Sequence, residues 1–336
     1  MVPSWLVIAG LAAGLAPATA EAELTPRQLA LVVNIADPKS VEIAEYYARR
    51  RGIPRANVVP VTLPVGRGEI SRHEFESAKA ELDAHVPAEV QALALAWTTP
   101  FRVDCLSITT AFAFGFDSAF CAEGCRPTKP SPYFDSNSSA PYRDLELRPA
   151  MLLAGTRVAD VRALIDRGVA SDGTFPSGTA YLLSTTDRAR NTRAARYPLV
   201  DTLGLPLRVE RLNANTLRDR QDVLFYFTGI GTVNALETLR FRPGAVADHL
   251  TSTGGVLNGR EQMSALRWLQ AGATGSYGTV AEPCNFPMKF PFPAVLIARY
   301  MRGETLIEAY WKSVAWPGQG LFIGEPLAAP FRAHDR

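Results

Sequence analysis

Residues 28–63, QLALVVNIADPKSVEIAEYYARRRGIPRANVVPVTL, decide the fold class. They open with a near-continuous apolar run, Gln28–Ala36, which predicts a strand buried on both faces. After Ser40, apolar side chains recur at helical spacing until Gly52, which predicts a helix that ends at this glycine. A second apolar run, Asn57–Leu63, predicts another strand. Strand, helix and strand in this order are typical of a parallel βαβ unit.

The same alternation continues along the rest of the chain. A helix is predicted at Ser71–His85 and a buried strand at Gln91–Trp97. Further helices are predicted at 157–167, 187–195, 245–250, 261–271, 294–301 and 306–314, and further strands at 178–184, 222–228, 273–280 and 320–323. The pattern predicts a single α/β domain over residues 23–336, in which helices flank a mostly parallel sheet of about six strands in three layers.

One segment interrupts this alternation. Residues 117–149 contain five prolines, two neighbouring cysteines and the polar string Asp135–Ser139. Long segments of this kind inside a compact domain are usually functional loops or disordered ones. We expect an inserted loop here.

Composition excludes two classes of protein. The 336 residues include 35 Lys and Arg against 33 Asp and Glu, so no surplus of positive charge is available to bind nucleic acid. Hydrophobic residues make up 47% of the chain, which excludes wholesale disorder.

The first 22 residues have the features of a signal peptide. Residues 5–16 form a short apolar run, and the alanines at 18, 20 and 22 offer small-x-small cleavage sites. No Lys or Arg precedes the run, so an uncleaved N-terminal anchor remains the alternative. No later stretch is apolar and long enough to span a membrane. We expect an exported protein, periplasmic or extracellular.

The chain has four cysteines, Cys105, Cys121, Cys125 and Cys284. In an oxidising compartment an even number favours disulfides, and four cysteines allow three pairings. A local bond between Cys121 and Cys125, or a bond from this pair back to Cys105, is the simplest arrangement, and it leaves Cys284 over. No histidine lies near the pair, so a zinc site is not expected, and nothing else in the sequence calls for a metal or a cofactor.

Candidate site residues follow the predicted strands, because ligands of open parallel sheets bind at the carboxyl ends of the strands. The residues found there are polar, charged or small. We expect a substrate-binding edge made of Asp37, Thr98, Thr99, Arg102, Asp187, Arg188, Gly229, Gly231 and Lys289.

Each candidate has a structural alternative. Asp37 precedes a proline and is well placed to cap a helix. Asp187 lies among Arg188, Arg190 and Arg193, a pattern also typical of a solvated helix face. The glycines at 229 and 231 lack the rest of a dinucleotide-binding motif.

Cys284 is the strongest candidate for a catalytic residue. It follows a buried strand, and Lys289 nearby would lower the pKa of the thiol and favour the nucleophilic thiolate. Glu282 and a base such as His249 would complete a catalytic group. The alternatives are a disulfide for Cys284 and a structural role for His249 on a predicted helix.

Three blocks carry a resemblance to a known family: Leu31–Val58, Gly272–Cys284 and Gly303–Pro330. They resemble uncharacterised exported bacterial proteins that co-occur with the exosortase sorting system. The similarity covers nearly the whole mature chain, and the family has no established activity.

The layout is more distantly similar to gingipain-type cysteine peptidases of the caspase-like fold. Phe225–Gly231 stands where those enzymes have a strand ending in Tyr-x-Gly-His-Gly, and Gly324–Leu327 stands where they have Gly-Asp-Pro. Ile230 replaces the catalytic histidine, and Thr251–Gly255 replaces the segment of the catalytic cysteine. The resemblance therefore implies a peptidase scaffold without the peptidase dyad.

Two functions remain open from the sequence. One is a non-catalytic protein of the cell envelope that binds an extended peptide or glycan segment at the carboxyl edge of the sheet, connected with sorted surface proteins. The other is a cysteine-dependent hydrolase that uses Cys284.

Overall fold

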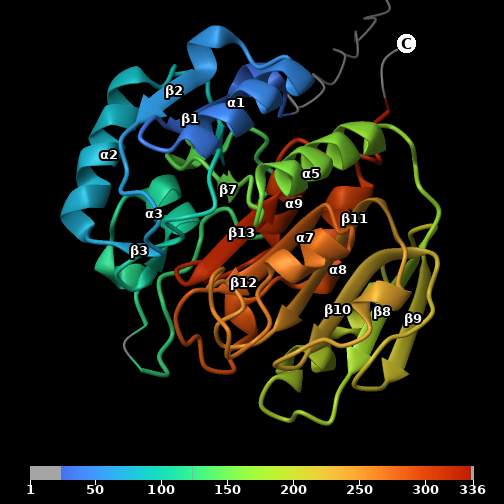
Figure 1. The fold of residues 1–336 in the computed structure, drawn as a ribbon. Coiled ribbons are helices and arrows are strands. Elements are labelled where there is room, and N and C mark those ends of the chain that lie inside the picture. The colour runs from blue at the N-terminus through green and yellow to red at the C-terminus, as the bar shows by residue number, and fades with distance from the viewer. Residues whose placement is uncertain (1–23, 123, 334–336) are drawn as a thin grey trace, which may run out of the picture.

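The chain folds around one ten-stranded sheet (Figure 1). The computed structural model describes residues 24–122 and 124–333, so the expected signal peptide at 1–22 lies outside the described residues. The strands of this sheet are β1 (Leu29–Asn34), β2 (Val58–Val61), β4 (Ala92–Leu95), β7 (Ala150–Leu152), β8 (Thr179–Ser184), β9 (Arg208–Asn213), β10 (Val223–Gly229), β11 (Phe241–Leu250), β12 (Gly275–Thr279) and β13 (Gly320–Gly324).

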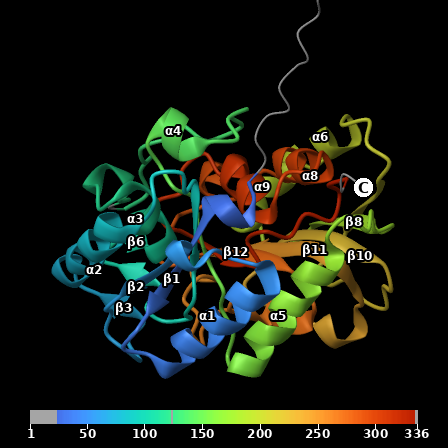
Figure 2. The ribbon, with the colours of Figure 1, turned by 90° about the horizontal axis from the view of Figure 1, so that it is seen from above.

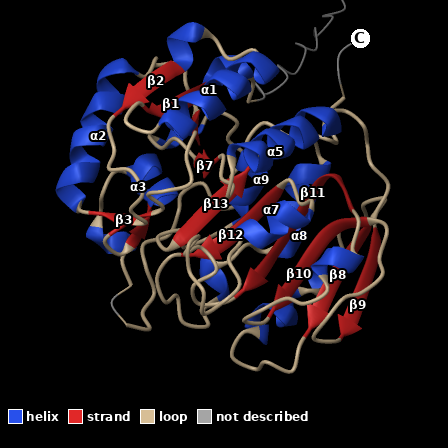
Figure 3. Ribbon diagram, viewed as in Figure 1, coloured by secondary structure: helices blue, strands red, loops and turns tan. Residues whose placement is uncertain are grey.

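The sheet is mostly parallel, and its strands follow the order β2-β1-β4-β7-β13-β12-β11-β10-β8-β9. Parallel ladders join β2, β1, β4 and β7, and a second set joins β12, β11, β10, β8 and β9. In the middle, β13 runs antiparallel to β12. Figure 3 shows the strands as one continuous layer. The predicted α/β class and the mostly parallel sheet are therefore confirmed.

Helices cover both faces of the sheet. They are α1 (Pro38–Arg51), α2 (Arg72–His85), α3 (Ile108–Phe114), α4 (Pro141–Leu145), α5 (Val158–Ser171), α6 (Pro198–Asp201), α7 (Leu266–Ala271), α8 (Pro293–Met301) and α9 (Leu306–Ser313). Seen from above, α1 and α5 lie on one side of the sheet and α8 and α9 on the other (Figure 2). No helix in the described ranges is long and apolar enough to cross a membrane.

Local sequence explains where the first helices begin and end. The Asp37 carboxylate accepts a hydrogen bond from the Lys39 backbone N–H at 3.0 Å and caps α1, and Gly52 ends the helix in the left-handed region at φ 64°. Ser71 and Glu74 form a capping box at the start of α2. These short-range signals place the two helices as the sequence predicts.

The two edges of the sheet differ from its centre. The central strands β1, β4, β10 and β12 are buried along their whole length. The edge strand β2 contains Pro60, which has no N–H to give to a further strand. The other edge strand, β9, contains no fully buried residue.

Several predicted elements are wrong. Ala245–Leu250, predicted as a helix, belongs to β11, which lies between β10 and β12 and is buried from Gly244 onward. The alanines favour a helix locally, but pairing on both sides decides the conformation. The polar helix predicted at 187–195 is replaced by a short 3-10 helix, Asn191–Arg196. The sheet has more strands than the sequence predicts, because β7, β9 and β11 were not expected.

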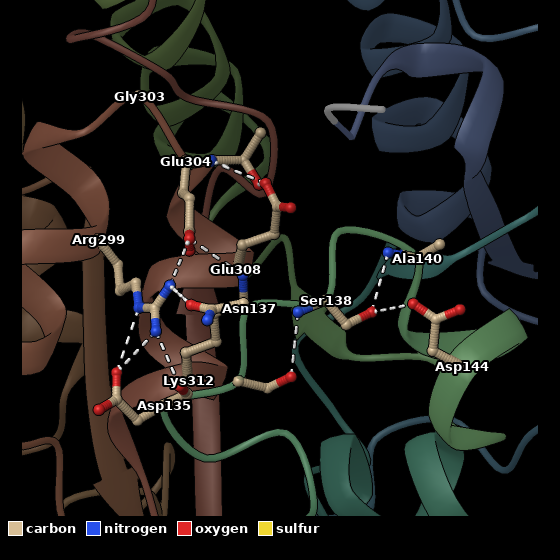
Figure 4. A network of polar contacts seen from close by, with 12 residues as sticks. Asp135, Asn137, Ser138, Ala140, Asp144, Arg299, Gly303, Glu304, Glu308 and Lys312 are labelled. Carbon is tan, nitrogen blue, oxygen red and sulfur yellow. Dashed lines mark hydrogen bonds and ion pairs between the residues drawn. The ribbon is translucent and has the colours of Figure 1, made fainter. Parts of the chain in front are cut away.

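The inserted loop at 117–149 is held by contacts with α8 and α9. Arg299 donates hydrogen bonds to the Asp135 carbonyl oxygen at 2.7 Å and to Asn137 Oδ1 at 2.9 Å (Figure 4). Arg299 also pairs with Glu304, which accepts a second bond, at 3.0 Å, from the buried Lys312. These contacts fix the middle of the loop against the helical face of the domain.

Candidate functional site

The strand order creates a crevice between β1 and β4. The chain passes from β1 to β2 on one side and then crosses to β4 on the other, so the loops after β1 and β4 diverge. Open α/β sheets bind ligands at such switch points, outside the carboxyl ends of the strands. A cleft of about 390 Å³ lies there and is called the switch-point cleft below. Its lining includes Asp37, Val65, Trp97, Thr98, Thr99, Thr156, Leu257, Asn258 and Leu266.

Thr98 joins two of the loops that form the cleft. Its hydroxyl donates to the Gly155 carbonyl oxygen at 2.9 Å and accepts from the Gly155 N–H at 3.1 Å. The loop after β4 is thereby tied to the loop after β7. Asp37 and Thr99 line the same cleft, so the structure brings these three predicted residues together.

Apolar side chains give the switch-point cleft its character. Ile43, Val161 and Leu266 line it, and Val65 at its wall is 51% exposed. Ile35, which directly follows β1, is 58% exposed. Large apolar side chains exposed beside a cleft are typical of binding surfaces.

A second cavity of about 590 Å³ adjoins the first. It is formed by residues 232–237, which follow β10, and by residues of the segment 257–270, which follows β11. Thr156, Leu257 and Leu266 line both cavities. The two together are called the carboxyl-edge groove below. No described residue of the inserted loop lines either cavity.

The predicted residues after β8 and β10 form a separate polar cluster. Arg190 pairs with Asp187 at 2.9 Å and donates to the Thr251 hydroxyl at 3.0 Å, while Arg188 is exposed. Gly229 is required, since a Cβ there would lie 2.0 Å from the Arg190 carbonyl oxygen. At Gly231 the nearest atom would lie at 3.7 Å, an ordinary contact. This cluster contributes nothing to the lining of the carboxyl-edge groove.

Arg102 does not join the predicted edge. It lies in β5 (Arg102–Val103), which forms a small second sheet with β3 (Glu69–Ile70) and β6 (Leu106–Ser107). Its guanidinium contacts the Asp104 carbonyl oxygen and pairs with Glu69 at 3.7 Å. A local hairpin, which the sequence did not predict, turns this side chain away from the cleft.

Cys284 is bonded to Cys125, and Cys105 is bonded to Cys121. The first bond joins the loop after β12 to the inserted loop, with 5.5 Å between the Cα atoms. A sulfur in a disulfide is not a thiolate nucleophile, so the structure contradicts the catalytic role expected of Cys284. Of the two simple pairings expected, the bond back to Cys105 is present and the local bond between Cys121 and Cys125 is not.

Glu282 and Lys289 lie in the loop that carries Cys284. The Glu282 carboxylate accepts a hydrogen bond from the Cys284 N–H at 2.7 Å and so shapes the turn. Lys289 is buried, and its Nζ has no hydrogen-bond partner among the described residues. Burial lowers the pKa of Lys289 to about 8, and Glu282 opposes this effect. Neither residue lines the carboxyl-edge groove.

His249 is a structural residue of β11, not a residue of a helix. Its Nδ1 accepts a hydrogen bond from the Trp268 indole at 2.9 Å, and its Nε2 contacts the Met263 carbonyl oxygen at 3.0 Å. Both nitrogens are therefore engaged, with the proton on Nε2. Burial lowers the pKa of His249 to about 4. The structure contradicts the general-base role expected of this histidine.

The preceding residue, Asp248, points to the other face of β11 and forms a buried ion pair. Its carboxylate lies 2.5 Å from the Arg193 guanidinium, and both side chains are 1% exposed. Arg193 also donates to the Thr228 carbonyl oxygen at 3.0 Å. Burial raises the pKa of Asp248 to about 6, against the opposing effect of Arg193. From the sequence, a solvated helix face or an ion pair was the alternative for the group that includes Arg193, and the structure has it in a buried ion pair.

Some lining residues that sequence reasoning missed follow strands it did not predict, whereas Val65 follows β2 and residues 232–237 follow β10, both of which it did predict. Thr156 follows β7, and Leu257 and Asn258 follow β11. Had these strands been recognised, the rule that nominated Asp37 and Thr98 would have nominated the loops after them as well. Within residues 24–122 and 124–333, no group of three His, Cys, Asp or Glu side chains could hold a metal ion.

The fold and the groove define a single-domain α/β protein with a mostly parallel sheet and a groove at its carboxyl edge. No family model matches the chain, and no curated protein matches it. The chain is similar to a solved structure described as "Structure of Protease", at 11% identity and a TM-score of 0.46. The alignment covers 92% of this chain and 80% of the chain in that structure.

Proposed function

We propose that this protein binds an extended segment of a ligand in the carboxyl-edge groove without transforming it. The observation that carries the proposal is the pair of adjoining cavities, about 390 and 590 Å³, at the carboxyl ends of β1, β4, β10 and β11. Two connected cavities suit a ligand that is longer than one side chain. Grooves of this size at this edge are the usual binding sites of open α/β sheets.

The chemistry of the groove favours a peptide over a glycan. The switch-point cleft is lined by aliphatic side chains such as Val65 and Leu266, which suit an apolar peptide side chain. Its one aromatic side chain, Trp97, is 1% exposed and offers no open ring face for a sugar to stack on. Polar contacts would come from Thr99, Thr156 and Asn258 at the walls.

Two structural features favour binding without turnover. The Cys284 sulfur is held in a disulfide, and both nitrogens of His249 are engaged in the core. A cysteine-dependent hydrolase that uses Cys284, the alternative considered from the sequence, requires a free thiolate. The binding function therefore explains the arrangement better than the hydrolase does.

The cell envelope is the compartment we propose for this function, with a link to exosortase-type protein sorting. Two disulfides suit an oxidising compartment, in agreement with the expected signal peptide and the family resemblance. Cell fractionation and the mass of the mature N-terminus test the location.

Selection from a phage-displayed library of linear peptides on the full chain tests the binding function. We expect enriched peptides that carry an apolar anchor residue and remain intact after incubation. Val65→Asp places a charge at the wall of the cleft and should weaken their binding about tenfold or more. Leu199→Asp is the matched control, because Leu199 is also 51% exposed but lines neither cavity.

Two results would contradict the proposal. One is cleavage of the selected peptides that stops when the groove is substituted, which would reveal an enzyme. The other is selected peptides whose affinity is the same for the wild type and Val65→Asp. A glycan array that yields ligands sensitive to Val65→Asp, where no peptide does, would replace the peptide with a glycan.

A further inference from the structure

A third cavity lies at the opposite edge of the sheet, beside the amino-terminal ends of β4 and β7. It measures about 300 Å³, at the lower end of small-molecule sites. The end of α2, the end of α3 and the inserted loop surround it. Its walls include the apolar side chains of Leu82, Val86, Leu93 and Phe112. This cavity shares no lining residue with the carboxyl-edge groove, so a ligand bound in it is independent of the function proposed for that groove.

A buried arginine lines this cavity. Arg148 is 8% exposed, its Nε donates to the Val90 carbonyl oxygen at 3.0 Å, and its guanidinium lies 3.2 Å from the centre of the Tyr142 ring. Among the described residues, no carboxylate forms an ion pair with it. Buried arginines in proteins are usually paired with an anion, because desolvating an unpaired charge is costly. Arg148 is therefore a buried cation that lacks an anionic partner.

The other charged groups at the cavity do not supply that partner. Asp83 is bound by Lys79 at 2.5 Å, so these two charges balance each other. The Glu146 carboxylate is exposed to solvent at the rim of the cavity. Burial lowers the pKa of Arg148, and Tyr142 and Asp83 only partly oppose this effect.

We propose that this cavity binds a monoanionic carboxylate attached to a small apolar group. The terminal N–H groups of Arg148 donate to the two carboxylate oxygens, a geometry that the planar guanidinium favours. The apolar part of the ligand lies against Val86 and Phe114, two lining side chains that are only half-buried. Glu146 adds negative charge at the rim of the same cavity, so a dianionic phosphate is disfavoured over a carboxylate.

Calorimetric titration of the full chain with three matched probes tests this site. Benzoate carries the carboxylate, benzamide is its neutral analogue, and phenyl phosphate carries a dianion on the same ring. We expect saturable binding of benzoate, with benzamide and phenyl phosphate each weaker by about tenfold or more. Arg148→Gln should weaken benzoate by a similar factor, since it removes the charge-assisted hydrogen bonds.

A second variant keeps the test sound if Arg148→Gln does not fold. Ala88 is exposed at the mouth of the cavity, so Ala88→Phe should block entry without disturbing the core. Ala84→Phe is its control, because Ala84 is exposed on α2 and does not line the cavity. The site is refuted if benzoate shows no saturable binding, if benzamide binds equally well, or if Ala88→Phe leaves benzoate binding unchanged. Tighter binding of phenyl phosphate would overturn the preference for a carboxylate.

Discussion

His249 should make the folded state sensitive to acid. The imidazole is fully buried, with Nδ1 accepting from Trp268 and Nε2 donating to the Met263 carbonyl oxygen. Protonation of Nδ1 would place a second N–H against the indole N–H and leave a positive charge in the core. Burial accordingly lowers the pKa of His249 from 6.5 to about 4.

The size and sign of this effect follow from the two pKa values. The unfolded chain takes up a proton on the imidazole below about pH 6.5, whereas the folded chain does so only near pH 4. The free energy of unfolding therefore decreases as the pH falls between these values, and it levels off below them. At about 1.36 kcal/mol per pKa unit, the loss is about 3 kcal/mol.

Asp248 acts in the opposite direction over nearly the same range. Its pKa is raised to about 6 from 3.8, so the folded state takes up this proton first, and acidification stabilises the fold between those values. This contribution is also about 3 kcal/mol at about 1.36 kcal/mol per pKa unit. The two effects largely cancel in the wild type, so only a variant separates them.

Denaturant unfolding of the wild type and His249→Gln, at intervals between pH 4 and 7, measures the histidine alone. At pH 7 the variant should be less stable by about 1–3 kcal/mol, because the Trp268 indole loses its acceptor. Toward pH 4 this difference should vanish or reverse, because the unfolded wild type then gains a proton on the imidazole that the buried ring does not take up, a penalty that glutamine lacks. His73→Gln, an exposed histidine on α2, is the control. A difference between wild type and His249→Gln that stays constant across the range refutes the reasoning.

Three further predictions concern stability. Asp248→Asn leaves a buried arginine without its carboxylate and should lower the free energy of unfolding, measured with denaturant, by about 3–5 kcal/mol. Replacing Cys125 and Cys284 together by serine removes a cross-link between residues 159 positions apart and should lower the same quantity by up to about 5 kcal/mol, without abolishing ligand binding in the groove. Gly229→Ala should lower the melting temperature by several degrees because its Cβ would meet a backbone carbonyl oxygen, whereas Gly231→Ala should leave it nearly unchanged.

The first βαβ units could be predicted because their signals are local. The apolar run Leu29–Val33 is bounded by a capping aspartate and a helix whose apolar side chains face one way. The strand β11 could not be predicted in this way. Its sequence, FRPGAVADHL, mixes helix formers with Asp248 and His249, and only its neighbours in the sheet and its internal partners make it a strand.

The candidate site was predicted in part, for a related reason. Asp37, Thr98 and Thr99 lie in one cleft because β1 and β4 are neighbours, and they were nominated because they follow predicted strands of a parallel sheet. Arg102 lies outside the cleft because a hairpin, β5 and β6, holds it elsewhere. Cys284 is held by a disulfide to Cys125, 159 positions earlier. A bond over 159 positions leaves no trace in local spacing, so for Cys284 the sequence could only state the alternatives.

Alternating residues of β11 bear on the binding function proposed above. Asp248 points to one face and is neutralised by Arg193, while His249 points to the other and is held between Trp268 and Met263. The two groups that could have supplied acid–base chemistry are thus used to fix the strand and the loop after it. The segment after this strand lines the groove and is held by His249 at Met263, and rigid walls lower the ordering cost of binding. In the proposed binding function, the polar residues of this strand therefore act through the shape of the groove and not through proton transfer in it.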